Sequence, residues 1–359
     1  KERLVLSKID YNQIVNETFE SSHVLGKCKK MLIIWYEYDS NKEAKDFLIT
    51  HYQLYDMEND LKVFNNDFEI IKNKVLDGKA HELSEGDTSY LGACTKARTS
   101  SDRTTQPFSD ILSKPRAYSL KNAYMTGILR EHINSKVITL NKYNTVEEYV
   151  KDKLRPYFGK TQVEILEKID GRKYSEKIPK NISKMISDEL IGKDTELPEK
   201  DEIFSKTSFI IKNLPIKENG KPIERMSFKT ISLSDFEEEW EDSFWKNYFE
   251  ETTLITICYQ AVNNSKNGFR VLKNVKKISF DEYDLDEFKK TYDQIKLAIE
   301  KEDINLLPTS ANGFKNQLLE IAPKGVKGDN AYENFFKNDK TKVSFMISKR
   351  LLIDKLSDE

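Results

Sequence analysis

Cysteine is scarce in this sequence. Among 359 residues there are only Cys28, Cys94 and Cys258, which lie far apart and are odd in number. This pattern argues against a disulfide framework and indicates a reducing compartment. No cysteine pair has zinc-site spacing, and the four histidines are scattered. The stretch His81-Glu-Leu-Ser-Glu85 lacks the second histidine of a zinc-binding helix, so zinc chemistry is not expected.

Long apolar runs and an excess of one charge are also missing. No segment has the length of apolar residues that a membrane helix needs, and we recognise no signal peptide. Fifty-eight Lys and Arg nearly balance 60 Asp and Glu, so any affinity for nucleic acid must come from local patches. The sequence therefore predicts a cytoplasmic protein without a membrane partner. Its length and its 38% hydrophobic content suit about two domains.

One local patch of positive charge lies between Lys96 and Arg130. It contains seven Lys and Arg against two acids and many Ser and Thr. An expected strand at Tyr90–Thr95 precedes it, a helix end at Gly78 lies before that strand, and a helix is expected at Leu120–Ile133. A basic loop held between short strands suits a polyanion, although a solvated surface loop has the same composition.

The other expected elements follow from apolar periodicity. Strands are predicted at Lys1–Ile9, Met31–Tyr38, His51–Met57 and Thr207–Ile211, and helices at Phe19–Lys30, Phe64–Leu76, Val146–Ile169 and Ile182–Ile191. A polar hinge at 134–145 separates the elements expected before it from the new helical pattern that begins at Val146. We therefore place one domain at 1–136 and a second at 137–359.

The second half of the sequence repeats the first in a common order. The matching segments are Ile223–Ile231 with Lys1–Ile9, Trp240–Ser243 with Phe19–Ser22, Leu254–Tyr259 with Ile33–Tyr38, Phe288–Ile299 with the helix before Gly78, Leu318–Lys324 with Tyr90–Lys96, and Ser344–Arg350 with Ala117–Asn122. The second copy has residues from about 144 to 222 ahead of its match, whereas the first has only Lys1. We therefore expect the first domain to be truncated at its N-terminus, with its helical front and a strand like Thr207–Ile211 upstream.

Three segments carry a family resemblance: Phe19–Lys30, Gly78–Lys96 and Pro115–Asn122. They resemble the MutH-type endonucleases, a group that contains a mismatch-repair nickase and GATC-cutting type II restriction enzymes built from two MutH-like halves. The sequence is more similar to the two-copy enzymes. The resemblance implies an α/β (α+β) fold of two restriction-endonuclease-like domains, each a mixed sheet flanked by helices.

The resemblance also implies a metal site. In the family an Asp and a Glu-x-Lys on adjacent strands bind Mg²⁺, which activates water for phosphodiester hydrolysis. The strand with Glu-x-Lys is absent from the first copy in this sequence. In the second copy it reads Phe209-Ile-Ile-Lys212, so that Lys212 keeps the lysine position but Ile210 replaces the glutamate. No metal ligand is therefore expected in this chain, and the second copy is expected to be catalytically degenerate.

The remaining site residues are implied by position in the family pattern. Lys27 matches a supporting lysine near the active-site phosphate, although it also fits a solvated face beside Lys29 and Lys30. Lys96 matches a DNA-contacting lysine of the recognition loop, since lysine can bond guanine or phosphate. The further expected DNA contacts are Arg98, Arg103, Arg116, Tyr118, Ser119, Lys121 and, in the second copy, Lys324.

Two functions remain open from the sequence. The first is a Mg²⁺-dependent type II restriction endonuclease for a GATC-like site in double-stranded DNA. In it the C-terminal copy is a non-cleaving effector domain, DNA induces a dimer, and this chain alone does not cleave. The second is a non-catalytic DNA-binding or protein-interaction module of two decayed copies. An Asp shortly before a Glu-x-Lys upstream of Lys1 distinguishes the first from the second.

Overall fold

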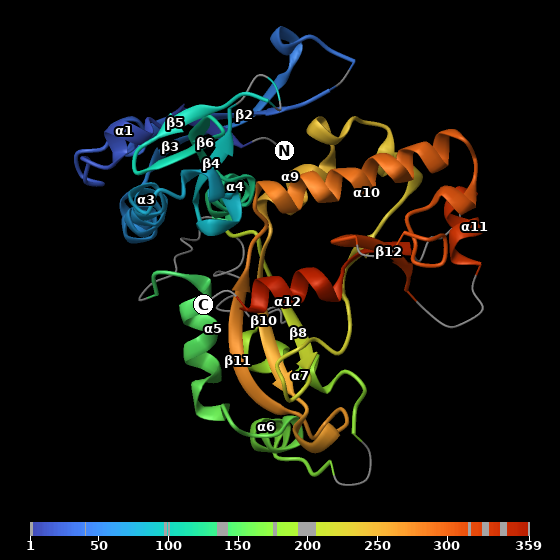
Figure 1. Ribbon diagram of the computed structural model, residues 1–359. Coiled ribbons are helices and arrows are strands. Elements are labelled where there is room, and N and C mark those ends of the chain that lie inside the picture. The colour runs from blue at the N-terminus through green and yellow to red at the C-terminus, as the bar shows by residue number, and fades with distance from the viewer. Residues whose placement is uncertain are drawn as a thin grey trace. The chain divides into compact units, whose positions relative to one another are not determined.

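The computed structural model shows two compact units (Figure 1). It describes residues 3–39, 41–96, 99, 101–134, 143–174, 178–192, 206–314, 317–324, 330–337 and 343–357. Unit 1 comprises Lys1–Val146 with Asp201–Ser208, and unit 2 comprises Glu147–Lys200 with Phe209–Glu359. The predicted α/β class with two units is confirmed. The predicted boundary at 136 lies outside the described residues.

Unit 1 is built around an antiparallel sheet with strand order β1-β7-β4. These strands are β1 (Leu4–Lys8), β4 (Leu91–Thr95) and β7 (Arg116–Leu120). Helix α3 (Leu61–Leu76) contributes the fully buried Phe64 and Phe68 to the core. Burying each such side chain contributes about 1.5–3 kcal/mol, so the helical spacing that predicts α3 also explains its packing.

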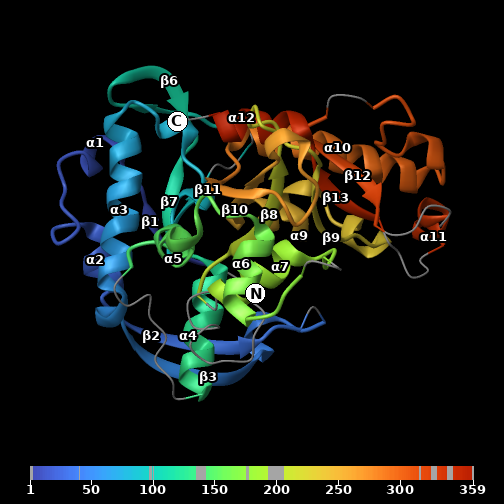
Figure 2. The same cartoon turned by 90° about the horizontal axis from the view of Figure 1, so that it is seen from below.

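A second, two-stranded sheet of unit 1 pairs β2 (Lys30–Glu37) with β3 (Leu48–Asp56) antiparallel. Figure 2 shows these strands as a ribbon of their own, with α4 alongside. The other helices and strands of unit 1 are α1 (Tyr11–Ile14), α2 (His23–Cys28), β5 (Thr104–Gln106), β6 (Ser109–Ser113) and α4 (Asn122–Asn134), with 3-10 helices η1 (Ala44–Asp46), η2 (Glu58–Asp60), η3 (Ala80–Glu82) and η4 (Glu85–Asp87).

Unit 2 contains two three-stranded sheets, with orders β11-β10-β8 and β12-β13-β9. Its strands are β8 (Phe209–Ile216), β9 (Met226–Thr230), β10 (Thr253–Gln260), β11 (Val271–Ile278), β12 (Leu319–Pro323) and β13 (Val343–Ile347). Its helices are α5 (Val146–Leu154), α6 (Gln162–Asp170), α7 (Ile182–Ile191), α9 (Phe244–Glu251), α10 (Glu282–Glu300), α11 (Ala331–Phe336) and α12 (Lys349–Ser357), with 3-10 helices η5 (Arg155–Tyr157), η6 (Leu233–Phe236), η7 (Trp240–Asp242), η8 (Val262–Asn264) and η9 (Ile304–Leu306).

Several predicted elements differ from the structure. The helix expected at Phe19–Lys30 is the shorter α2 (His23–Cys28), and the strand expected at His51–Met57 is β3, which begins at Leu48. The single helix expected over Val146–Ile169 is broken after α5, because Pro156 lies in a short 3-10 turn. A new helix, α6, then starts at the capping box of Thr161 with Glu164. The strand expected at Thr207–Ile211 is β8, which begins two residues later and extends to Ile216.

The two units repeat the same series of elements. The sheet β1-β7-β4 of unit 1 has the same order as β9-β13-β12 of unit 2, and β2-β3 corresponds to β10-β11. Even a helix cap recurs: Ser22 accepts from the backbone N–H of Leu25 at 3.2 Å, and Ser243 accepts from that of Lys246 at 3.1 Å. These parallels support the duplication expected from the sequence. Among the described residues of unit 1, no strand corresponds to β8.

Candidate nucleic-acid interface

Lys96 lies directly after β4, at the start of the basic loop of unit 1. Its backbone N–H donates to the carbonyl of Pro115 at 2.8 Å, which continues the pairing of β4 with the segment before β7. The side chain is exposed and has no hydrogen-bond or ion-pair partner among the described residues. A free ammonium at the end of a buried strand is a suitable contact for a phosphate or a base edge.

The loop after Lys96 is held by its own polar groups. Thr99 donates its hydroxyl to Asp102 Oδ1 at 2.6 Å, and the exposed Arg103 donates Nη1 to the Asp102 carbonyl at 2.9 Å. These contacts orient the loop without burying Arg103. Arg98, another predicted contact, lies outside the described residues.

Two predicted DNA contacts are cations that the structure buries. Arg116 is 4% exposed and donates Nη1 to the carbonyl of Ala93 at 2.6 Å, across the β4–β7 pairing. Lys121 is 1% exposed and donates to the carbonyls of Glu85 and Thr88. Both therefore tie β7 to the neighbouring strand and turn. A direct contact with DNA would require each side chain to leave these partners. The burial of these two cations was not predicted from the sequence.

Tyr118 and Ser119 are also buried, in the middle of β7. Burial raises the pKa of the Tyr118 hydroxyl far above its usual range, and its ring stacks on Phe68 of α3 at 6.3 Å between centroids. Ser119 faces Gly92 so closely that a Cβ at that glycine would lie 2.7 Å from the serine Oγ. In this structure both residues serve the packing of the sheet.

Asp67 organises the start of β4 and was not anticipated from the sequence. Its fully buried carboxylate accepts the backbone N–H groups of Ser89, Tyr90 and Leu91 at 2.6–2.9 Å. One buried acid thus satisfies three successive backbone donors at the start of β4. The available signal was an acid between Phe64 and Phe68 on the apolar face of α3.

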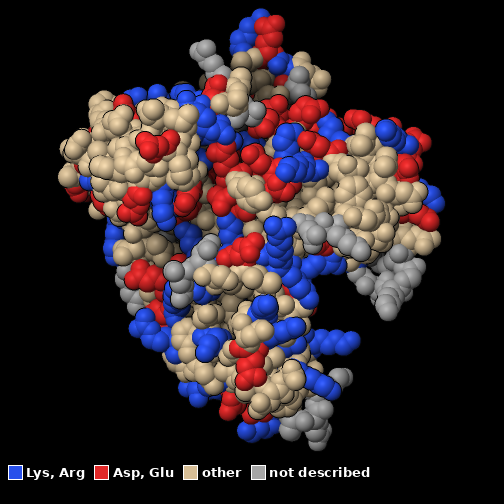
Figure 3. All heavy atoms as spheres, in the orientation of Figure 1, with Lys and Arg blue, Asp and Glu red and all other residues tan. Residues whose placement is uncertain are grey.

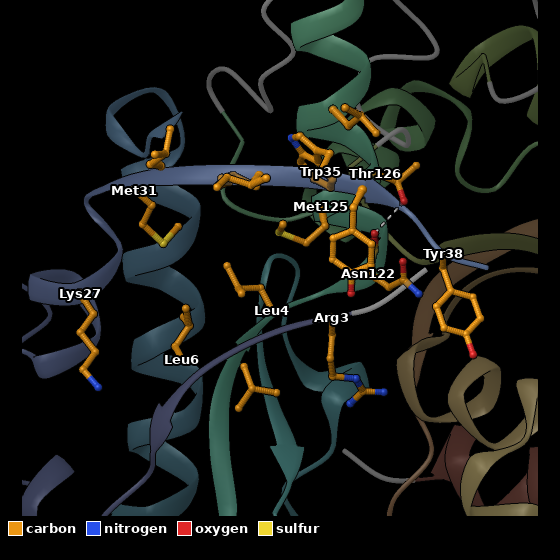
Figure 4. A pocket seen from close by; sticks show the side chains of 16 residues that line it. Arg3, Leu4, Leu6, Lys27, Met31, Trp35, Tyr38, Asn122, Met125 and Thr126 are labelled. Carbon is orange, nitrogen blue, oxygen red and sulfur yellow. Dashed lines mark hydrogen bonds between the residues drawn. The ribbon is translucent and has the colours of Figure 1, made fainter. Parts of the chain in front are cut away.

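Lys27 lies elsewhere in unit 1, on the last turn of α2. Its side chain is exposed and lines a cavity of about 960 Å³, together with Arg3 and apolar residues of β1, β2 and α4. Figure 4 shows Leu4, Met31 and Met125 extending into this space. Arg3 forms an ion pair with the fully buried Glu85. The two basic residues therefore border a mainly apolar groove, which Asn122 and Thr126 also line.

In unit 2, the residues at the family's metal-site positions are engaged in packing. Ile210 is half-buried and packs against the hydrophobic core. Lys212 donates Nζ to the carbonyl of Ser227 at 2.5 Å and lies 5.6 Å from the centre of the Phe228 ring. An isoleucine side chain offers no oxygen to a hard cation, so this donor set does not fit Mg²⁺.

Lys324 differs from its counterpart Lys96. It is half-buried and donates Nζ to the carbonyl of Phe228, and partial desolvation lowers the pKa of its ammonium. The structure therefore engages the lysine of unit 2 in the fold and leaves the lysine of unit 1 exposed.

The described part of the chain shows neither a metal-binding cluster nor a membrane-spanning helix. No group of three or more His, Cys, Asp or Glu there can hold a metal ion, and no described helix is long and apolar enough to cross a membrane. On the face shown in Figure 3, basic and acidic side chains are interspersed.

Comparisons with known proteins show what this chain is similar to. Residues 1–73 match the family described as DNA mismatch repair enzyme MutH. The type II restriction enzyme Sau3AI of Staphylococcus aureus is 34% identical over 306 residues, which cover 79% of this chain and 62% of that enzyme. The chain thus spans less than two thirds of the relative it matches. The chain is therefore similar to the MutH-type endonucleases in its first 73 residues and, over 306 residues, to this type II restriction enzyme.

Proposed function

We propose that this chain is the larger part of a type II restriction endonuclease that recognises a GATC-like site in double-stranded DNA. In this proposal unit 1 is the main DNA reader, through Lys96 and Arg103, and unit 2 is a non-cleaving DNA-binding or effector domain. The support is the similarity to a type II restriction enzyme and the exposure of these cations at the end of β4.

The observation that carries the proposal is that the chain keeps a residue suited to DNA contact but lacks a metal ligand at the expected position. Unit 1 keeps an exposed lysine at the end of β4, whereas unit 2 has Ile210 where the family pattern needs a carboxylate. Mg²⁺ belongs to the proposal for the complete enzyme, because the described residues do not supply its ligands. We therefore propose that the chain by itself binds DNA and does not cut it.

The test of this proposal separates binding from cleavage. The chain is incubated with Mg²⁺ and a plasmid that contains GATC sites, and its affinity for matched duplexes with and without GATC is measured over a salt titration. We expect no cleavage, tighter binding to the GATC duplex, and a loss of affinity as salt rises. Cutting by the chain alone contradicts the assignment of the missing carboxylates, and equal affinity for both duplexes contradicts GATC recognition.

One observation favours a second candidate, a non-catalytic DNA-binding or protein-interaction module. Lys212 and Lys324 of unit 2 are both bonded to backbone carbonyls of β9, which is what a decayed copy with a purely structural role would show. Sedimentation distinguishes the candidates. If the restriction-enzyme proposal holds, specific DNA shifts the chain to a dimer, whereas unchanged sedimentation favours the module.

A further inference from the structure

The β10–β11 hairpin of unit 2 lies in a strongly basic stretch of the chain. From Thr252 to Phe280 there are five Lys and Arg and no Asp or Glu, although the whole chain has nearly equal numbers of both signs. The side chains of Lys266, Arg270 and Lys273 have no hydrogen-bond or ion-pair partner among the described residues. Cations that no acid of the fold neutralises create a local field that attracts anions.

A pocket of about 560 Å³ lies between the loop of this hairpin and the turn that joins β8 to β9. Its lining includes three cations, which are Lys217 of the turn with Lys266 and Arg270 of the hairpin, and one acid, Glu218. Lys217 is exposed, and its side chain also has no partner among the described residues. Most of the remaining lining consists of asparagine and serine. The pocket is therefore polar and carries an excess of positive charge.

Two hydrogen-bond donors of this pocket are shielded from solvent and unpaired. They are the hydroxyl of Ser265 and the Nε of Arg270, and neither has a partner among the described residues. Shielded polar groups are nearly always paired, so two unpaired donors in one pocket call for an explanation. An oxyanion carries several acceptor oxygens and a negative charge. The unpaired donors and the unpaired cations therefore indicate the same class of ligand.

The loop of the hairpin is held in shape by helix α6, which lies against it (Figure 1). The buried Gln162 of α6 accepts the backbone N–H of Gly268 with Oε1 at 2.8 Å, and its own backbone N–H donates to the Arg270 carbonyl at 3.0 Å. Asn263 and Asn264 have positive φ values of 51° and 57°, a conformation that asparagine adopts more readily than most residues. A loop fixed in this way holds the pocket's side chains in place before a ligand binds, which lowers the entropic cost of binding.

The pocket differs in position from Lys324 and in charge from the corresponding loop of unit 1. Lys324 follows β12, in the sheet β12-β13-β9, whereas the pocket lies at the ends of β8 and β10 in the other sheet of unit 2. In the β2–β3 hairpin of unit 1, Lys42 pairs with Asp39 at 3.2 Å and Lys45 pairs with Glu43 at 2.8 Å. Those loop lysines are neutralised by neighbouring acids, so the unpaired cations of the hairpin loop are a feature of unit 2.

We propose that this pocket is a phosphate-binding site through which unit 2 holds the backbone of duplex DNA. Lys217 and Lys266 contact the phosphate as point charges on flexible stems, and Arg270 and the Ser265 hydroxyl donate hydrogen bonds to its oxygens. Such contacts position a duplex without reading its bases, so unit 1 remains the reader of sequence. The inference rests on the proposed function, because it takes DNA as the source of the phosphate.

The first experiment removes charge from the pocket at exposed positions, where the fold is not disturbed. The pocket variant carries Lys217→Gln and Lys266→Gln, and its matched control carries Lys301→Gln and Lys337→Gln, two exposed lysines elsewhere in unit 2. The affinity of each full chain for a duplex without GATC is measured over a salt titration. We expect the slope of log affinity against log salt to fall by about two in the pocket variant and to stay unchanged in the control.

The second experiment uses inorganic phosphate alone. Phosphate is titrated at constant ionic strength, and amide hydrogen exchange of Ala261–Arg270 is followed by mass spectrometry. We expect phosphate to slow exchange of this loop in the wild type and in the control, and to leave it unchanged in the pocket variant. If the chain binds duplexes with and without GATC equally, the proposed function fails, whereas the salt slope and the phosphate titration still decide whether the pocket is a site.

The two experiments together distinguish DNA from other occupants of the pocket. A lower slope in the pocket variant supports the proposal even without protection by free phosphate, because a duplex offers many phosphates at once. Equal slopes with protection by phosphate overturn DNA as the occupant and identify a small phosphorylated ligand. Equal slopes without protection overturn the site itself. Salt-sensitive self-association without DNA that is lost in the pocket variant also overturns the proposal, and it identifies an acidic segment of a second copy of the chain as the occupant.

Discussion

Strands β2 and β10 have similar apolar sequences and opposite environments. Ile33–Tyr38, which begins in β2, and Leu254–Tyr259 of β10 are both mainly apolar and aromatic, each with one polar residue, Glu37 and Thr256. Such runs are the pattern of a strand covered on both faces. In unit 2 the neighbours β8 and β11 and the core bury β10. In unit 1 most of β2 is exposed. The difference shows that burial depends on the neighbours that are present, whereas the sequence pattern records the neighbours that a strand is suited to have.

A second comparison concerns how each unit fixes the start of its long helix. In unit 2, Lys355 of α12 bonds Asp281 and Asp284 at the start of α10, at 2.9 and 2.6 Å. In unit 1, the acids are Asp60 before α3 and Glu131 on α4. Lys206, from the separate segment Asp201–Ser208, bridges these acids at 2.8 Å each. Unit 1 thus obtains from a distant part of the chain the cation that unit 2 carries on its last helix.

The largest predicted effect comes from removing that bridging cation. Lys206→Met should destabilise unit 1 by about 3–5 kcal/mol, because it leaves two carboxylates without their buried partner. Lys206 is 1% exposed and its partner Asp60 is 4% exposed, so water cannot replace the ion pair. Thermal unfolding, with hydrogen exchange to assign each transition to a unit, measures the loss.

Lys355→Met is the matched control in unit 2. Its partner Asp281 has a side chain that is 37% exposed, so solvent relieves part of the lost interaction and we expect a smaller effect, confined to unit 2. Equal losses of stability in both variants, or a loss of stability in unit 2 from Lys206→Met, would show that the ion pairs of Lys206 and of Lys355 do not stabilise their units separately.

The next prediction tests the contrast between β2 and β10. Ile255→Ala in β10 should cost about 2–5 kcal/mol, because Ile255 is fully buried and the change leaves a cavity. Ile34→Ala at the matching position of β2 should cost less than about 1 kcal/mol, since Ile34 is 51% exposed. Chemical denaturation of both variants checks the pair. A large cost at Ile34 would mean that β2 is covered in solution.

The elements that depend on local pattern were predictable from the sequence, and those that depend on distant partners were not. The spacing of Phe64 and Phe68 predicts α3, and the apolar run at Met31–Tyr38 predicts β2 to within a residue at each end. By contrast, Lys206 is one lysine in a charged stretch, and nothing nearby indicates that its partners are Asp60 and Glu131.

The candidate site shows the same limit. Lys96 is exposed, as its position in a basic loop suggests. Arg116 and Lys121 belong to the same basic stretch, yet both are buried because backbone carbonyls of β4 and of the turn before it accept their hydrogen bonds. A charged residue can be buried when the fold places hydrogen-bond acceptors beside it. Here the positions of those acceptors depend on the pairing of β4 with β7, which the sequence does not reveal.

The unfolding free energy of unit 2 should depend on pH through Asp284, at the start of α10. Burial, with the nearby charge of Asp281, raises the pKa of Asp284 from 3.8 to about 6. Between about pH 4 and 6 the folded chain therefore retains a proton that the unfolded chain has lost. Stability from this group is greatest below pH 4 and falls as pH rises to 6, by at most about 3 kcal/mol. Asp284→Asn should flatten that part of the curve of unfolding free energy against pH.

The measurement for Asp284 is urea unfolding of the wild type and of Asp284→Asn at several values between pH 4 and 7. The difference between the two proteins cancels the contributions of other titrating groups. A difference that stays constant across this range, or that grows in the opposite direction, contradicts the raised pKa.

The smallest predicted effect compares the two loop lysines in DNA binding. Lys96 is exposed without a partner among the described residues, whereas Lys324 already donates to the Phe228 carbonyl. Lys96→Ala should therefore lower the slope of log affinity against log salt by about one and weaken binding by about 1 kcal/mol if the contact is to phosphate alone. Lys324→Ala should change neither quantity and should instead reduce the stability of unit 2, because the Phe228 carbonyl loses its donor.

A GATC duplex and a matched duplex without GATC show which kind of contact Lys96 makes. If Lys96 contacts a base, Lys96→Ala lowers the affinity for the GATC duplex more than for the other. Equal effects of the two substitutions on DNA binding would mean that both copies read DNA, and the contrast between a reading unit and a structural one would be wrong.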